Sequence, residues 1–407
     1  MTNQMNRAVD WQKPLEKIPD KFWDVLIVGA GPAGSTAAIH LASGGHKVLV
    51  VDMAHFPRTK ICGDCMITDV TSCLERVGLL GAVHESGTRL DGISIFSTSG
   101  VDFTVPGAFF TLRREILDTI LARKAVESGA TFALGQIDGL TVSDDATITA
   151  SARVPGGIVR ARLGIVATGA HIGLIRRLGA VYFVKPSAIA GRSYIQSSVD
   201  LDRIILSYDR SIVPGYGWIV PLGNNMYNVG CGFFLGESRL RNLRQCFDAF
   251  VSQFPLARNL LDNGHIVSPL RAAPLRCGLR GVAVRVDRSI LIAGETIGTT
   301  FPLTGEGIGQ AMRTGELAAA AVGAVLENGE REHLKEYSMA IESHLRSRHD
   351  GFEYAQKWVS RPWLNDFMAR RVKRSDYLQE ACSRFIADSG DPRIIYSLPA
   401  VLKSFWK

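Results

Sequence analysis

The sequence predicts an α/β protein with a buried parallel sheet near its N-terminus. Three consecutive patterns predict it: DVLIVGAG reads as a buried strand that enters a glycine turn, PAGSTAAIHLASGG has helical spacing, and KVLVVD reads as a second buried strand. A helix that joins two parallel strands forms a βαβ unit. The chain has 407 residues, of which 46% are hydrophobic and 21% charged, so it is long enough to bury a large core.

The first turn carries a glycine pattern with a chemical use. Gly29, Gly31 and Gly34 form GxGxxG between strand and helix, and Asp52 ends the next strand eighteen residues after Gly34. The first glycine permits a tight turn, the second lets the backbone approach a pyrophosphate, and the third lets helix and strand pack closely. The helix N-terminus offers N–H groups to the phosphates, and Asp52 suits the ribose hydroxyls. We therefore predict a dinucleotide site, which FAD and NAD fit equally well.

The later elements follow in order. Helical spacing runs from Leu112 to Gly129, RARLGIVATGA predicts a strand that returns to the nucleotide end, and residues 181–234 alternate as in an antiparallel sheet. SILIAGE predicts another buried strand before a long small-residue helix, and the rest reads as helical. We divide the chain into a polar N-terminal tail (1–22), a discontinuous nucleotide-binding domain (23–85, 111–180 and 281–330), a substrate-side antiparallel sheet domain (86–110 and 181–280) and a C-terminal helical region (331–407).

Charge and cysteine content narrow the partners and the compartment. The formal charge of +7 favours anionic ligands or membrane surfaces, while the dispersed basic residues and the lack of any finger or RNA-binding motif argue against nucleic acid. The N-terminus lacks the apolar core of a secretory signal, and no apolar run reaches about 18 residues. Seven scattered cysteines do not form a disulfide framework. These features predict a cytoplasmic protein with reduced thiols.

A second glycine-rich segment points to the cofactor. LIAGETIGTTFPLTGEGIGQAM resembles the flavin-contacting segment of the FAD-dependent monooxygenase and geranylgeranyl reductase superfamily, whose usual form is GDxxG followed by PxxGxG at a helix start. The matching residues are Gly294, Gly298, Pro302, Gly305 and Gly307, and Glu295 stands where aspartate is usual. The resemblance implies FAD. We expect residues 304–307 to place free backbone N–H groups beside flavin N1 and the C2 carbonyl, where negative charge accumulates on reduction.

Other matches extend this resemblance over nearly the whole chain. FPRTKICGDCM resembles FPRxKxCGDG, and GYGWIVPLGNNMYNVGCG is similar to the YGWxFP and VNVG strands of the geranylgeranyl reductase branch. In LRREILD, Arg114, with Arg113 as the alternative, matches an arginine that approaches the FAD pyrophosphate. Thr168 stands where the family's ADGxxSxxR motif has aspartate.

The chain thus resembles the FAD-dependent geranylgeranyl reductases, within the para-hydroxybenzoate hydroxylase-like flavoproteins that also include flavin monooxygenases and flavin-dependent halogenases. This resemblance implies the Rossmann-like FAD/NAD(P)-binding fold of that superfamily, with an interleaved antiparallel-sheet substrate domain and a helical C-terminus. The residues that we assign to cofactor binding are Gly29, Gly31, Ala33, Gly34, Asp52, Arg58, Cys62, Gly63, Arg114, Gly294, Glu295, Pro302, Gly305, Glu306 and Gly307.

Four residues that we place on the substrate side of the flavin each have two interpretations. Cys62 and Cys65 form CxxC without the further ligands that zinc needs, so they are a redox dithiol beside the flavin or, as we favour, a turn residue and a small core residue. Tyr216 and Trp218 either shape the wall that faces the flavin or belong to the core. We assign no catalytic side chain and no metal site, because the flavin itself carries the hard chemistry.

One C-terminal tract has the composition of a membrane-facing helix. WVSRPWLNDFMARRVKR places Trp363, Leu364, Phe367 and Met368 at helical spacing beside arginines. Apolar stripes usually face the protein core, so packing on the chain's own domain is favoured over contact with the cytoplasmic face of a membrane.

The resemblance implies reduction of a carbon–carbon double bond in an isoprenoid or similarly apolar molecule, by hydride from flavin N5. The alternative is a monooxygenase that modifies an aromatic or carrier-bound metabolite; the lack of a WxWxIP motif weakens halogenation. A non-enzymatic flavin-binding protein is a third interpretation. Because no second GxGxxG follows a strand, either NAD(P)H docks transiently or another protein delivers the electrons.

Overall fold

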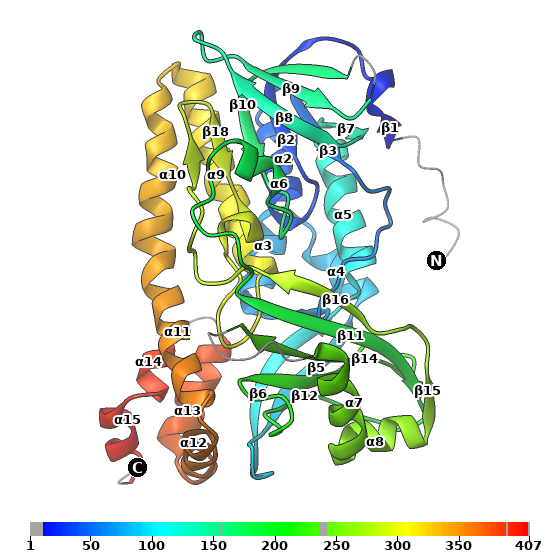
Figure 1. The fold of residues 1–407 in the computed structure, drawn as a ribbon, viewed down its shortest axis with the longest axis vertical. Coiled ribbons are helices and arrows are strands. Elements are labelled where there is room, and N and C mark those ends of the chain that lie inside the picture. Colours follow the sequence, from blue (N-terminus) through cyan, green and yellow to red (C-terminus); the bar gives the residue numbers. More distant parts are fainter. Residues whose placement is uncertain (1–10, 155–156, 236–241, 388–389, 406–407) are drawn as a thin grey trace.

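The computed structural model describes residues 11–154, 157–235, 242–387 and 390–405. Two sheets lie one beyond the other along the long axis; the C-terminal region runs beside both, with residues 334–340 next to the first and residues 362–386 next to the second (Figure 1). This architecture confirms the predicted α/β fold of the para-hydroxybenzoate hydroxylase type. The site lies where the two sheets and the C-terminal helices meet.

The first sheet is the predicted parallel one. Its strand order is β1-β7-β3-β2-β10-β18-β17, with the β8–β9 hairpin attached to β10. Val28 pairs with Val51 on one side and with Val166 on the other, so β2 lies at the centre. The strands are β1 (Lys13–Pro14), β2 (Phe22–Val28), β3 (Val48–Asp52), β7 (Thr131–Leu134), β8 (Ile137–Val142), β9 (Ile148–Ala152), β10 (Ile158–Val166), β17 (Arg285–Val286) and β18 (Ile290–Ile292).

Small residues bring two helices close to this sheet. A Cβ on Gly34 of α2 would lie 1.8 Å from the Gly29 carbonyl oxygen, and a Cβ on Gly315 of α9 would lie 2.3 Å from the Ala33 carbonyl oxygen. Only glycine permits these approaches, so α9 packs directly on α2 beside the glycine turn. The helices around this sheet are α2 (Pro32–Ser43), α3 (Thr68–Arg76), α4 (Leu80–Ser86), α5 (Arg114–Glu127), α6 (Gly173–Arg177) and α9 (Ile308–Asn328).

The second sheet has the order β15-β11-β14-β13-β12-β5-β6-β4, with β16 paired to β11. Its neighbours are antiparallel except β12 and β5, which are parallel. One face packs against α7 (Leu243–Gln253) and α8 (Pro255–Asp262) through Phe247, Phe250 and Leu260. The strands are β4 (Cys65–Met66), β5 (Thr88–Phe96), β6 (Asp102–Thr111), β11 (Ala188–Ser197), β12 (Ile204–Ser207), β13 (Gly215–Pro221), β14 (Met226–Phe234), β15 (Gly264–Ile266) and β16 (Arg271–Leu275).

The C-terminal region is helical, as predicted. A π-helical segment over Ile341–Arg346 joins α10 to α11. In α12, Leu364 and Met368 are buried and Phe367 is half-buried, as the packing interpretation predicts, whereas Trp363 is 67% exposed. The helices are α10 (Leu334–Ala340), α11 (Ser347–Val359), α12 (Pro362–Arg374), α13 (Asp376–Ile386), α14 (Pro392–Ile395) and α15 (Leu398–Lys403).

The segment that the sequence set apart as a polar tail takes part in the first sheet where the structure describes it. Strand β1 pairs with β7 in parallel, and the Trp11 ring lies 4.8 Å from the Phe132 ring. The Gln12 amide also binds both backbone polar groups of Phe56. Residues 1–10 lie outside the described residues.

Candidate cofactor and substrate site

A cavity of about 670 Å³ runs from the first sheet into the second. Its lining includes every residue that the sequence assigned to cofactor binding except Gly34 and Pro302. Gly34 lies beneath the turn, and Pro302 packs near Gly278. Cys65, Tyr216 and Trp218 also line it. The cavity therefore brings together residues that lie more than 250 positions apart in the sequence.

The glycine turn is shaped for close approach of a ligand. Gly29 has φ +103°, and a Cβ there would lie 2.3 Å from the Ala167 carbonyl oxygen. At Gly31, by contrast, a Cβ would point into the cavity, with only the Arg58 Nη2 atom near it, at 3.6 Å. The α2 helix begins at Pro32, so its N-terminal N–H groups and positive dipole face the same space. These features fit a bound phosphate group.

Asp52 is held in place by the backbone around it. Its Oδ2 atom accepts a hydrogen bond from the Ala30 N–H at 2.7 Å, and Oδ1 accepts one from the Ala54 N–H at 2.9 Å. Each carboxylate oxygen can accept a further hydrogen bond, so the oriented group can still bind ribose hydroxyls.

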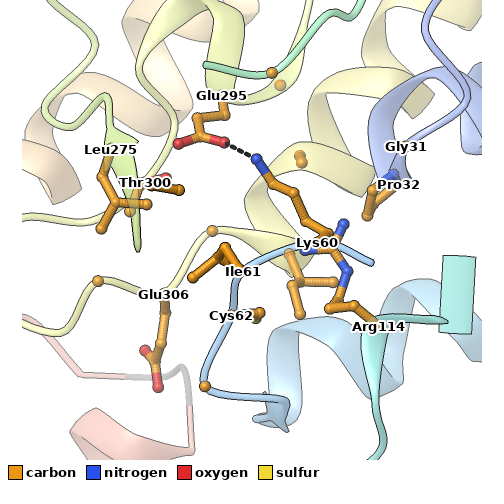
Figure 2. A pocket seen from close by; sticks show the side chains of 18 of the residues that line it. Gly31, Pro32, Lys60, Ile61, Cys62, Arg114, Leu275, Glu295, Thr300 and Glu306 are labelled. Atoms are coloured by element: carbon orange, nitrogen blue, oxygen red, sulfur yellow. Dashed lines mark hydrogen bonds and ion pairs between the residues drawn. The ribbon is translucent and has the colours of Figure 1, made fainter. Parts of the chain in front are cut away.

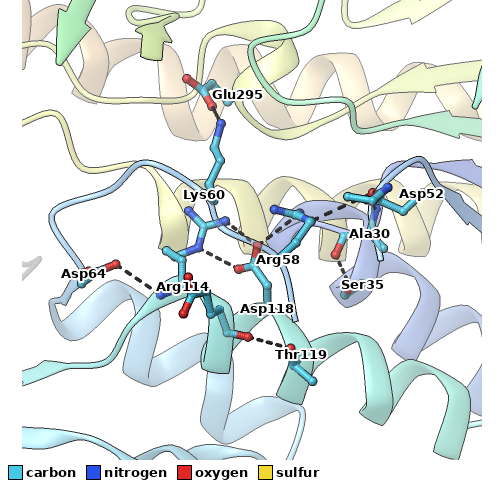
Figure 3. Close-up of polar contacts among 12 residues, drawn as sticks. Ala30, Ser35, Asp52, Arg58, Lys60, Asp64, Arg114, Asp118, Thr119 and Glu295 are labelled. Atoms are coloured by element: carbon cyan, nitrogen blue, oxygen red, sulfur yellow. Dashed lines mark hydrogen bonds and ion pairs between the residues drawn. The ribbon is translucent and has the colours of Figure 1, made fainter. Parts of the chain in front are cut away.

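Two arginines share one buried carboxylate beside the glycine turn (Figure 3). Arg114 donates from Nε and Nη2 to Asp118 at 2.7 and 2.9 Å, and Arg58 Nη2 lies 3.2 Å from Asp118 Oδ2. Two guanidinium groups therefore meet at one carboxylate, and Arg58 Nε also lies 4.0 Å from Asp52 Oδ1; guanidinium groups beside the turn suit a pyrophosphate. The alternative, Arg113, does not line the cavity and instead pairs with Glu115 at 3.2 Å.

The turn before α9 closes on itself, which corrects one expectation. The Gly305 N–H donates to the Phe301 carbonyl at 3.1 Å, so it is not free for a flavin. The physical reason is the left-handed backbone at Leu303 (φ 80°) and Gly305 (φ 70°), which folds the turn back. Gly307, the N-cap of α9, has no acceptor for its N–H within the described residues, and the Tyr216 hydroxyl donates to the Thr304 carbonyl.

The substituted Glu295 forms a contact across the cavity. Lys60 Nζ, from the FPRTKICGDCM segment, lies 3.5 Å from Glu295 Oε2 (Figure 2). The other carboxylate oxygen, Oε1, is buried without a hydrogen-bond partner among the described residues. The ion pair therefore links two cavity segments, and it leaves one polar atom for a ligand.

Sequence reasoning missed a buried network under the CGDC turn. Asp64 Oδ2 accepts hydrogen bonds from the Tyr194 hydroxyl at 2.7 Å and from the Asn228 amide at 2.8 Å. Asn228 also donates to the Cys62 carbonyl at 2.8 Å and accepts from Trp218 Nε1 at 2.9 Å. Burial raises the pKa of Asp64, and the Tyr194 and Asn228 hydrogen bonds oppose that rise. The sequence signal for this network was the pair of matched motifs, CGD and NVG, whose polar residues form hydrogen bonds inside the protein.

The two CxxC thiols face the cavity but are not activated. Burial raises the pKa of Cys62 and of Cys65, so both thiols are protonated at neutral pH. All seven cysteines are free. No group of three His, Cys, Asp or Glu side chains is placed to bind a metal in the part of the chain that the structure describes.

The far end of the cavity is apolar and is closed by the C-terminal helices. Periodicity could not predict this closure, because it does not say which element a helix packs against. Tyr208 and Tyr216 lie here with ring centroids 5.8 Å apart, and burial raises the pKa of both phenols. The apolar lining residues are Ile93, Ile95, Phe103, Val105, Ala190, Ile204, Leu206, Val220, Phe352, Cys382, Phe385, Ile386 and Ile395.

Charged groups are also present at this end. Glu306 and Arg348 both line the cavity, and in Figure 2 the Glu306 side chain extends away from the Lys60–Glu295 pair. The arrangement combines a polar half that suits a dinucleotide with an apolar half that suits a second, hydrophobic molecule.

Comparison with known proteins also points to FAD as the dinucleotide. A family model described as an FAD binding domain matches residues 23–205. A menaquinone reductase of Mycobacterium tuberculosis is 31% identical in an alignment of 323 positions, which covers 74% of this chain and 76% of that protein. A digeranylgeranylglycerophospholipid reductase of Methanothermobacter thermautotrophicus is 28% identical over 75% of this chain and 78% of that protein.

Two solved structures share the fold. A geranylgeranyl bacteriochlorophyll reductase-like protein from Thermoplasma acidophilum has a TM-score of 0.75 at 21% identity, covering 96% of this chain and 97% of that one. A flavin-dependent brominase also has a TM-score of 0.75, at 18% identity, covering 95% of this chain and 98% of that one. At these identities the likeness shows the fold alone.

Proposed function

Because the chain belongs to the FAD-dependent geranylgeranyl reductase family, and is therefore a flavin-dependent oxidoreductase, we propose that it reduces a carbon–carbon double bond of an isoprenoid or similarly apolar molecule. The observation that carries this proposal is the apolar half of the cavity, which continues directly from the polar half. The relatives include menaquinone and digeranylgeranylglycerophospholipid reductases, which supports a substrate with an apolar chain.

The residues of the polar half fit FAD. Gly31 opens toward the cavity, Arg58 and Arg114 place guanidinium groups beside it, and Asp52 is oriented at the end of β3. When bound there, the flavin supplies a hydride from N5 to one carbon of the double bond, and a proton must reach the other carbon. The protein's part is to bind and orient both molecules and to keep water out through the wall that the C-terminal helices form.

The electrons for each cycle come from a donor. We propose that NAD(P)H docks transiently or that a donor protein supplies two electrons, because the chain has one GxGxxG unit and that unit belongs to the FAD half.

Product analysis without oxygen tests the proposed function. The FAD-loaded protein is reduced chemically under argon and incubated with a polyprenylated quinone, with a polyprenylated glycerophospholipid, and with a phenol as the aromatic alternative. Products that carry two added hydrogen atoms per double bond, formed at the same yield without oxygen, support the proposal. Products that contain oxygen and form only in air would instead assign the monooxygenase function.

A further inference from the structure

The C-terminal helices expose apolar side chains that a folded protein normally buries. We define the C-terminal apolar surface as Trp363 at the start of α12, Ile394 in α14, and Leu398, Leu402 and Phe405 in and after α15. These side chains are 67%, 50%, 68%, 59% and 58% exposed, respectively. They lie on the helices at one end of the molecule (Figure 1). Isolated exposed apolar residues are common, but a group of large ones marks an interaction surface.

The orientation of α15 is the sharpest observation. Leu398, Leu402 and Phe405 are spaced at i, i+4 and i+7, so they share one face. The opposite face, with the small residues Ala400 and Ser404, packs on the protein. Arg371 holds the end of this segment: its Nε atom donates to the Ser404 hydroxyl at 3.1 Å, and its guanidinium lies 3.8 Å from the Phe405 ring centroid. The short helix α15 is therefore fixed with Leu398 and Leu402 facing outward, while Arg371 lies against the Phe405 ring.

Exposed basic side chains lie on the same helices and beside them. Arg361, Arg370, Arg374 and Lys403 are exposed, and the first three form no ion pair with any residue that the structure describes. Exposed leucine and aromatic side chains beside unpaired arginines match the chemistry of an anionic lipid surface, whose headgroups attract cations while its interior takes apolar side chains. A second copy of the chain fits less well, because an isologous contact would bring the same arginines together.

The same helices form the wall of the cavity. Ile394 is 50% exposed, whereas its neighbour Ile395 is 2% exposed and lines the cavity together with Phe385 and Ile386 of α13. The outward surface therefore lies directly behind the apolar end of the cavity.

We propose that the C-terminal apolar surface docks on an anionic lipid bilayer, with α15 and the start of α12 inserted at the headgroup level. This contact is peripheral. None of the helices that the structure describes is long and apolar enough to cross a bilayer. If the proposed function holds, docking places the apolar end of the cavity against the phase that dissolves its substrate, but the docking itself does not depend on turnover.

Vesicle flotation of the full-length protein tests the proposal. We expect the protein to float with phosphatidylcholine vesicles that contain phosphatidylglycerol, to float less with phosphatidylcholine alone, and to be released by high salt. Leu398→Ser with Leu402→Ser should weaken binding to the anionic vesicles by about tenfold or more. Arg370→Gln with Arg374→Gln should weaken it by roughly thirtyfold there, and should change binding to neutral vesicles little.

The matched control replaces two large exposed side chains elsewhere on the protein. Ile158→Ser with Tyr182→Ser changes side chains that are 59% and 76% exposed and lie outside the C-terminal helices, so binding should stay at the parental level. The proposal is overturned if the parental protein does not float, or if the leucine variant floats as well as the control. It is also overturned if light scattering shows a dimer that only the leucine changes dissociate. Flotation is measured without substrate, so a protein that binds vesicles but reduces nothing would refute the proposed function alone.

Discussion

The Tyr194 hydroxyl donates a 2.7 Å hydrogen bond to Asp64 Oδ2 and so ties the substrate sheet to the turn that carries Cys62. Asp64 is fully buried and its backbone is left-handed, with φ 60°. Burial raises its pKa above the ordinary aspartate value, so its proton is released less readily in the folded protein than in the unfolded chain. The contribution of Asp64 to stability therefore falls as the pH rises from about 4 through its folded pKa.

Tyr194→Phe removes a donor that favours the charged form of Asp64. The pKa of Asp64 should rise further, and the free energy of unfolding should fall by about 1.5–3 kcal/mol at pH 7, with a smaller loss at pH 4 where the carboxyl is protonated. Urea unfolding at both pH values measures this difference. Tyr227→Phe is the control, because that hydroxyl donates to the neutral Val199 carbonyl and its loss should cost the same at both pH values. Equal losses for Tyr194→Phe at both pH values would contradict a charged acceptor.

Gly31→Val should abolish FAD binding while the protein still folds. The Cβ at this position points into the cavity and its backbone has φ −75°, so valine adds no local strain but blocks the approach of the pyrophosphate. Flavin absorbance after gel filtration measures occupancy. Gly34→Ala should behave differently and destabilise the fold, because its Cβ would lie 1.8 Å from a backbone oxygen, whereas Gly323→Ala, with nothing within 4 Å, should do neither. Full flavin occupancy in Gly31→Val would refute the assignment.

Gly305→Val should lower the reduction potential of the bound flavin and slow its reduction more than it weakens retention of the ADP half. The valine Cβ would lie 3.1 Å from the Tyr216 hydroxyl at a backbone φ of +70°, so the turn and the Gly307 N–H must move. Loss of one such donor costs on the order of 3 kcal/mol in transition-state stabilisation.

Gly329→Val, at the other end of α9, controls for backbone strain, because Gly329 also has a positive φ (+79°) but no neighbour within 4 Å. Potentiometric titration and stopped-flow reduction compare the two proteins. If Gly305→Val keeps the parental reduction potential and reduction rate, this turn serves only as the start of α9.

Cys62→Ser with Cys65→Ser should keep both FAD and the reduction rate. The raised pKa of each thiol keeps it protonated, and the thiolate is the reactive form in redox exchange. Alkylation of the native protein at pH 7 should therefore be slow at both positions. Cys231→Ser, on β14 and outside the cavity lining, controls for the general effect of the substitution. Loss of turnover with retained FAD in the double variant alone would establish the dithiol as redox-active.

Local sequence patterns predicted the helices and strands well, but they predicted poorly which of them contact one another. The βαβ unit, the antiparallel strands and the α9 start follow from periodicity and glycine spacing, which act over a few residues. The Lys60–Glu295 ion pair joins residues 235 positions apart, and no local pattern encodes such a meeting. The choice of Arg114 over Arg113 likewise depends on Asp118, one helical turn later, which holds one guanidinium toward the cavity.

The same limit explains the C-terminal helices. Their apolar spacing predicted helices. Whether an apolar face is buried, as in α12, or exposed, as in α15, depends on the part of the protein that packs against it, which the spacing does not encode. For Tyr216 and Trp218 both interpretations describe part of the structure, since each lines the cavity and also packs within a cluster of buried apolar residues.

The order of strands in the first sheet has a consequence for synthesis. Its neighbours β2, β10 and β18 come from residues 22–28, 158–166 and 290–292, and the cavity wall is finished only at Tyr396. On the ribosome, a nascent chain that has emerged as far as the glycine turn and Asp52 still lacks one flank of the nucleotide sheet and the C-terminal helices that close the apolar end of the cavity. The nucleotide sheet and the turn before α9 are therefore complete only after residue 307 has emerged, and C-terminally truncated chains would leave the apolar end of the cavity open to chaperones and proteases.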